Sequence, residues 1–182
     1  MPSVGVFQIH DPGLSLDYCL DCAGIARKSR KGQFNHFYAF FDEDVKQQIY
    51  RNKRMEGEMK PALENGEFMP FYQPQYDAGT KKIVGAEALV RWIKPDGSIV
   101  SPGEFIPLFE KNGFISELDK YMFRTVCAQQ KKWLDEGYGI VPVSVNVSRK
   151  LLYDLNLVEK YNAVLAETGL PVQYMEVEIT ES

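Results

Sequence analysis

The stretch that decides the fold is Gly85-Ala86-Glu87-Ala88-Leu89-Val90-Arg91-Trp92. It lies between a β-branched run and a Pro-Asp-Gly loop, which predicts a strand over about 83–90 that runs into a turn. Side chains alternate between the two faces of a strand, so Glu87, Leu89 and Arg91 share one face. Burying an unpaired charge is expensive, so these two charged groups need partners. The pattern allows a structural Glu–Arg ion pair at a barrel rim, or a site for a metal or a phosphate.

The composition is that of an ordinary globular protein. The 182 residues are 45% hydrophobic and 25% charged, enough to bury a core in one or two domains. The net charge of -4 argues against strong non-specific binding to DNA or RNA. It leaves room for a nucleotide that is held by a few cations and a metal.

No run of the sequence predicts a membrane span or a signal peptide. Apolar runs stay well below the ~18 residues that a span needs. Cys19 and Cys22 have zinc-like or redox-like spacing, but no second Cys/His pair accompanies them. We therefore expect reduced thiols along a helix and a cytoplasmic location.

The N-terminal part predicts a small α/β piece. Its expected elements are a strand, a helix capped by Ser15 and a second strand, over 4–9, 16–29 and 37–41. This piece is near the lower limit of independent stability, so we expect it to be the end of a larger domain. A largely polar helix over 43–64 follows and is typical of a linker, with Pro61 expected to kink or restart it.

From residue 68 onward, strands alternate with helices, which predicts an α/β domain with a mostly parallel sheet. Ser101 and Ser148 are expected to cap helices. The expected strands are 68–74, 83–90, 141–147 and 174–180, and the expected helices are 104–111, 116–136, 149–153 and 157–167. Four strands are too few for a (β/α)8 barrel of ~250 residues, so we expect the first half of a TIM-like barrel.

Three oxygen-bearing side chains stand at or near strand ends: Glu87, Asn146 and Glu178. Oxygen ligands from separate strands that converge at one barrel mouth would suit Mg²⁺ or Mn²⁺. Asn146 taken alone favours a turn or cap residue over a ligand. Glu176 and Glu178 are also compatible with solvated alternate positions on an edge strand.

Five segments, in this order, resemble successive motifs of the EAL domain, the family of bacterial cyclic di-GMP phosphodiesterases. They are Tyr72-Gln73-Pro74, Glu87-Ala88-Leu89-Val90-Arg91-Trp92, Ser101-Pro102-Gly103-Glu104-Phe105-Ile106-Pro107, Ser144-Val145-Asn146-Val147-Ser148 and Glu178-Ile179-Thr180-Glu181-Ser182. The resemblance covers residues 67–182. Five ordered motifs are far more specific than the tripeptide Glu-Ala-Leu.

The resemblance implies metal-dependent hydrolysis of cyclic di-GMP to linear pGpG. In this family Mg²⁺ or Mn²⁺ would neutralise the scissile phosphate and lower the pKa of the attacking water. The residues matching the family's metal ligands are Glu87, Asn146 and Glu178, and those matching its substrate contacts are Arg91 and Gln73. Glu181 matches the second Glu of the Glu-x-Thr-Glu motif, which anchors an active-site loop in the family, so Glu87 and Glu181 are the expected catalytic residues.

The first 35 residues resemble the last strand and helix of a GGDEF (diguanylate cyclase-like) domain, through Ala23-Gly24-Ile25-Ala26-Arg27-Lys28-Ser29 and Gly32. No GGDEF signature is present, so no cyclase activity is expected. The expected organisation is a GGDEF remnant over 1–41, a linker helix over 42–66 and the first half of an EAL domain over 67–182.

EAL enzymes continue with an Asp-Asp pair, a Lys, a further Glu and a Gln that have no counterparts in this sequence. We therefore expect a fragment of a larger GGDEF–EAL phosphodiesterase, inactive on its own. One alternative is a non-catalytic module that binds cyclic di-GMP or a protein partner. Another is a half-barrel whose exposed strand edge pairs with a second copy in a homodimer.

Overall fold

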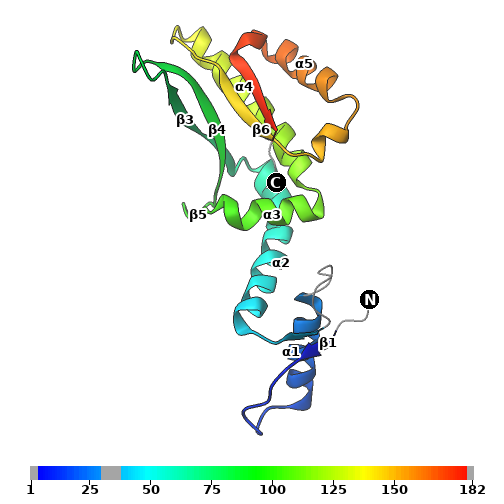
Figure 1. The fold of residues 1–182 in the computed structure, drawn as a ribbon. Helices are drawn as coiled ribbons and strands as arrows, with labels where there is room; N and C mark the ends of the chain where they lie inside the picture. The colour runs from blue at the N-terminus through cyan, green and yellow to red at the C-terminus, as the bar shows by residue number, and fades with distance from the viewer. Residues whose placement is uncertain (1–3, 30–37, 180–182) are drawn as a thin grey trace. The chain divides into compact units, whose positions relative to one another are not determined.

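The computed structural model describes residues 4–29 and 38–179 (Figure 1). The chain divides into two compact units, Met1–Glu58 and Met59–Ser182. The division falls within helix α2 (Glu43–Glu64), which matches the predicted polar helix. Pro61 lies inside α2, which continues to Glu64 rather than restarting there. Within the described ranges, no helix is long and apolar enough to cross a membrane.

The first unit contains β1 (Val4–Val6), α1 (Leu16–Ser29) and β2 (Tyr38–Phe40). β1 and β2 pair in parallel over three residues each, so the first strand is shorter than the predicted 4–9. Gly5 is required where α1 packs on β1, because a Cβ there would lie 1.8 Å from the carbonyl oxygen of Ala23.

Two predictions about α1 are confirmed. The hydroxyl of Ser15 accepts a hydrogen bond from the N–H of Tyr18 at 3.3 Å, so Ser15 caps the helix. Cys19 and Cys22 are buried on α1 as free thiols. Gly32, expected to end this helix, lies outside the described residues.

A mixed sheet forms the centre of the second unit, in the strand order β3-β4-β6-β7. Its strands are β3 (Phe68–Tyr76), β4 (Ile83–Ile93), β6 (Val143–Val147) and β7 (Met175–Ile179), and the short β5 (Ile99–Val100), which was not predicted, pairs with β4. β3 and β4 form an antiparallel hairpin, whereas β4, β6 and β7 run parallel. β3 is an edge strand, which explains how it accommodates Pro70 and Pro74.

The helices of this unit lie close to their predicted positions. They are α3 (Pro102–Asn112), α4 (Ile115–Asp135) and α5 (Leu157–Thr168), with 3₁₀ turns η1 (Leu151–Tyr153) and η2 (Val172–Tyr174). Gly113 and Gly169 end α3 and α5 with φ of 92° and 69°, as predicted for helix terminators. The capping predictions for Ser101 and Ser148 are wrong in their chemistry, because neither hydroxyl makes a capping hydrogen bond.

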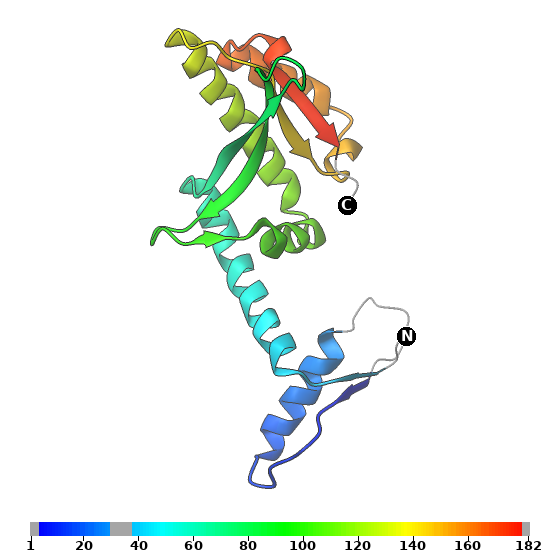
Figure 2. The same ribbon diagram turned by 60° about the vertical axis from the view of Figure 1, so that its left-hand side comes forward.

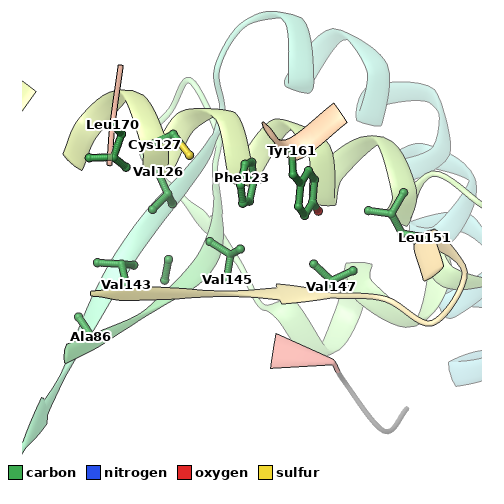
Figure 3. Packing of buried hydrophobic residues seen from close by; sticks show 11 residues of the cluster. Ala86, Phe123, Val126, Cys127, Val143, Val145, Val147, Leu151, Tyr161 and Leu170 are labelled. Atoms are coloured by element: carbon green, nitrogen blue, oxygen red, sulfur yellow. The ribbon is translucent and has the colours of Figure 1, made fainter. Parts of the chain in front are cut away.

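The main core lies between β6 and the helices α4 and α5. Figures 1 and 2 show α4 running along the sheet, and Figure 3 shows the β6 valines pointing toward it. Phe123 of α4 stacks on Tyr161 of α5 with ring centroids 3.8 Å apart. The buried members of this core are Ala86, Ala88, Phe123, Val126, Cys127, Val143, Val145, Val147, Leu151, Tyr161 and Leu170.

A second, aromatic cluster packs α3 against the C-terminal end of β4. Phe68, Trp92, Phe105 and Phe109 are all fully buried there. The indole N–H of Trp92 donates a hydrogen bond to Glu67 Oε2 at 2.9 Å. This cluster holds the β3–β4 hairpin in place and with it the strand that carries the EAL-like motif.

Candidate active site

Two of the expected metal ligands are in contact. Glu87 of β4 pairs in register with Ser144 of β6, and Asn146 lies two residues further along β6 on the same face. Asn146 Nδ2 donates a hydrogen bond to Glu87 Oε1 at 2.7 Å. Both residues are half-buried. The structure thus brings together two side chains that are 59 positions apart in the chain.

Glu178 lies beside this pair. It is the register partner of Asn146 across the parallel β6–β7 ladder, so both side chains project from the same face of the sheet. Glu176 pairs with Ser144 one row earlier on the same face. Both glutamates are exposed on β7. Glu178 therefore lies in the same row as Asn146, and its role as a third ligand stays a prediction.

Ser144 also lies in the candidate site. The sequence pointed to it only as a member of the segment Ser144-Val145-Asn146-Val147-Ser148. Its register partners are Glu87 on one side and Glu176 on the other. Ser144 is 1% exposed, and within residues 4–29 and 38–179 its hydroxyl finds no hydrogen-bond partner. The signal that could have found it is the strand period, because Ser144 precedes Asn146 by two residues.

The structural Glu–Arg ion pair does not form. Arg91 lies four residues beyond Glu87 on β4, roughly 13 Å along an extended strand. Its guanidinium instead donates from Nη1 to the carbonyl oxygen of Val90 at 2.9 Å and lies 5.8 Å from the ring centroid of Phe71. Between residues 4–29 and 38–179, no ion pair joins Glu87 to Arg91. The remaining N–H groups of Arg91 are suited to bind an anion.

The other two expected site residues have different outcomes. Gln73 is the antiparallel register partner of Glu87, exposed and on the same face of the sheet. The structure therefore places Gln73 next to the Glu87–Asn146 pair. Glu181 lies outside the described residues.

A cavity of about 280 Å³ opens where β4 separates from β6. The two strands pair only from Ala86↔Val143 to Ala88↔Val145, and beyond that point β4 continues toward β5. The residues that line this cavity include Arg91, Asn146, Asp119, Ser148, Leu118 and Met122. It is mostly apolar and borders the candidate site.

The side chains of the candidate site match the donor types of a divalent cation. Glu87, Asn146 and Glu178 offer only oxygen donors to an ion, which suits Mg²⁺ or Mn²⁺. Among the residues that the structure describes, no group of three or more His, Cys, Asp or Glu side chains could hold a metal. Two carboxylates and one carboxamide fit such an ion in kind, but they fill only part of a six-coordinate shell.

Comparison with known proteins decides the family. The family model described as "EAL domain" matches residues 56–182. The chain belongs to the EAL domain family. EAL domains depend in general on a divalent metal, in keeping with the oxygen donors on β4, β6 and β7.

Its relatives include signalling proteins and cyclic di-GMP enzymes. The signaling protein YkoW of Bacillus subtilis is 35% identical over 93% of this chain and 21% of its own length. MucR of Pseudomonas aeruginosa, a bifunctional diguanylate cyclase/cyclic di-GMP phosphodiesterase, is 28% identical over 99% of this chain and 26% of its own length. The chain thus spans about a quarter or less of these curated relatives.

A solved phosphodiesterase structure shares the fold of much of this chain. The "PaMucR Phosphodiesterase, c-di-GMP complex" aligns with a TM-score of 0.65 and 31% identity. The alignment covers 71% of this chain and 52% of that one. The α/β architecture predicted from the sequence is confirmed at this level.

Proposed function

We propose that this chain is part of a metal-dependent phosphodiesterase that hydrolyses cyclic di-GMP to linear pGpG. The observation that carries the proposal is the contact between Glu87 and Asn146, with Glu178 in register beside them, in a member of the EAL family. The relative MucR, described as a cyclic di-GMP phosphodiesterase, supports the same substrate class.

In this proposal Glu87, Asn146 and Glu178 hold Mg²⁺ or Mn²⁺. A divalent ion bound there would supply Lewis-acid stabilisation of the phosphate and a lowered pKa for its bound water. The hydrogen bond from Asn146 keeps Glu87 oriented toward β6, and the register with β7 sets the spacing of Glu178. Arg91 binds a non-bridging phosphate oxygen, because a guanidinium offers two parallel donors.

Two further residues complete the proposed site. Gln73 borders it from β3 and contacts the substrate, since it is the cross-strand neighbour of Glu87. Glu181 anchors a loop of the site and takes part in catalysis. The motif Glu178-Ile179-Thr180-Glu181 supports this role for Glu181.

The domain organisation is proposed on the same basis. Residues 1–41 form a GGDEF remnant, 42–66 a linker helix and 67–182 the first half of an EAL barrel. The alignment with MucR over 99% of this chain supports a tandem origin, because that relative is described as both cyclase and phosphodiesterase. We place the protein in the cytoplasm, where thiols such as Cys19, Cys22 and Cys127 stay reduced.

We propose further that these 182 residues bind cyclic di-GMP without cleaving it. Among the described residues, the proposed ligands Glu87, Asn146 and Glu178 are too few to fill a six-coordinate shell, which argues against cleavage by this chain. This is also the specific argument for the second candidate function, a non-catalytic cyclic di-GMP-binding module. The two candidates differ in what the parent protein does with the bound nucleotide.

Chromatography of cyclic di-GMP incubated with the chain and Mg²⁺ or Mn²⁺ tests these proposals, together with an equilibrium binding titration. The expected result is binding without pGpG, and binding weakened at least tenfold in Glu87→Ala and Arg91→Ala. Glu159→Ala, an exposed glutamate on α5, serves as the matched control and should bind like the unaltered chain. Release of pGpG that Glu87→Ala abolishes would show that the chain is catalytic, for example through two copies that complement each other. Absence of binding would contradict the proposed function.

A further inference from the structure

A buried carboxylate on α4 has no part in the proposed site. Asp119 is 8% exposed, and its Oδ2 accepts a hydrogen bond from the backbone N–H of Ser148 at 2.9 Å. Burial raises the pKa of Asp119, and hydrogen bonding from Ser148 opposes that rise. Burying a carboxylate is expensive, so a carboxylate in this position calls for a functional explanation.

Ser148 directly follows β6, two residues after Asn146. β4 pairs with β6 only as far as Ala88↔Val145, so Asn146 has no backbone partner on β4. Its remaining neighbour is β7, which is an edge strand in the part of the chain that the structure describes. The position of Asn146 along the strand is therefore fixed by the β6–β7 ladder, which reaches Val147↔Ile179, together with what holds the segment after β6.

Several contacts hold that segment, but they differ in what they can fix. Leu151 is buried in the core, and apolar contacts have no directional preference. Lys150 donates from Nζ to the carbonyl oxygen of Glu110. Asp154 pairs with Lys160 at 2.6 Å and with Lys120 of α4 at 3.7 Å, and the three lysines are exposed. Exposed pairs of this kind contribute little.

The bond between Asp119 and Ser148 is both directional and buried. The backbone N–H of Ser148 makes the hydrogen bond of good geometry to α4, and the Ser148 side chain adds to it by lowering the pKa of Asp119. A fixed backbone at Ser148 limits how far Asn146 can shift along β6. Such a shift would move Asn146 Nδ2 away from Glu87.

We propose that Asp119 is a positioning residue that holds Asn146 against Glu87 through the backbone of Ser148. The use of Asn146 as a ligand rests on the proposed function, but its position can be measured without nucleotide or metal. The role resembles that of the outer partners of metal ligands, whose loss typically lowers metal affinity or activity about 10–100-fold.

The test follows the side-chain amide signals of Asn146 in ¹H–¹⁵N NMR spectra of the full 182-residue chain, assigned by their loss in Asn146→Asp. Glu87→Ala sets the reference shift for a released amide. Asp119→Ala is expected to move the signals by at least half of that reference. Asp119→Asn keeps an acceptor oxygen and should restore most of the original position. Glu117→Ala, an exposed carboxylate two residues away on α4, should leave the signals unmoved.

If Asp119→Ala fails to fold, an ester in place of the Ser148 amide removes only the donor and takes its place in the test. The proposal is wrong if both this ester and any folded Asp119→Ala leave the Asn146 signals in place. It is equally wrong if Asp119→Asn moves them as far as Asp119→Ala does, since the acceptor would then not matter.

A second readout separates this proposal from the proposed function. Cyclic di-GMP affinity in Mg²⁺ is expected to fall about tenfold in Asp119→Ala relative to Asp119→Asn. If the unaltered chain binds no cyclic di-GMP, the proposed function fails, and the NMR comparison alone decides the role of Asp119. If the chain binds and the two variants bind equally well, Asp119 has no positioning role for the site.

Discussion

The two faces of β6 divide stability from chemistry within five residues. Val143, Val145 and Val147 are at most 2% exposed and pack toward α4, as Figure 3 shows. Ser144 and Asn146 point the other way, toward Glu87 on β4 and the glutamates of β7. Alternation along a strand lets one face carry the core while the other tolerates polar groups. The comparison teaches that substitutions one residue apart on β6 should have opposite consequences.

The largest difference is expected from placing the same carboxylate on each face. Val145→Asp buries an unpaired charge in the main core and should cost more than about 4 kcal/mol of unfolding free energy. Asn146→Asp, the matched control, should lose much less, because residue 146 is half-buried and outside the core, although its carboxylate would repel Glu87. Thermal unfolding followed by circular dichroism measures both. Equal losses in the two variants would show that β6 does not separate the faces in this way.

A smaller loss is expected from truncating the helix side of the same core. Phe123 is 2% exposed and stacks on Tyr161, so Phe123→Ala should cost about 3–4 kcal/mol through lost burial and the cavity left behind. Urea denaturation measures the change. Phe71→Ala, on the opposite face of the sheet and exposed, should cost under about 1 kcal/mol. A similar cost for both would contradict a core confined to the helix side.

The core face should also respond to alkaline pH. Burial raises the pKa of the Cys127 thiol to about 12, above the ~8.5 of an unfolded chain. As pH rises, the unfolded state loses the thiol proton before the folded state does. The contribution of the protonated thiol to the free energy of unfolding is therefore complete below pH ~8.5 and is lost as pH rises toward 12. The free energy of unfolding should fall by up to about 1.4 kcal/mol per pH unit from this group. In Cys127→Ala, the free energy of unfolding measured by urea denaturation should fall less between pH 9 and pH 10.5 than in the unaltered chain. An equal fall in both proteins would contradict the assignment of this pH dependence to Cys127.

The smallest effect on stability is expected on the polar face. Asn146→Ala removes one half-buried hydrogen bond and should change the unfolding free energy by about 1 kcal/mol or less. The same variant should lose cyclic di-GMP binding in Mg²⁺ by at least tenfold. Urea denaturation and the binding titration measure the two quantities on one preparation. If Asn146→Ala lost stability but kept its affinity, the assignment of binding to this face of β6 and of stability to the valine face would be wrong.

Local patterns in the sequence were enough for much of this architecture. The alternation of Glu87, Leu89 and Arg91 on one face, the cap at Ser15 and the ends of α3 and α5 at glycines all depend on a few neighbouring residues. Such features follow from side-chain period and backbone preference, which are short-range. The order of strands and helices from residue 68 to 179 follows from the same kind of signal, with the exception of β5.

The candidate site needed the tertiary structure. Strand register sets which residues face each other across β4, β6 and β7, and it depends on how the sheet packs against its helices. That register brought Asn146 to Glu87 and put Ser144 between two glutamates. The bond from Ser148 to Asp119 joins residues 29 positions apart on different elements. No periodic pattern in the sequence relates residues that are so far apart, so only the tertiary structure determines this contact.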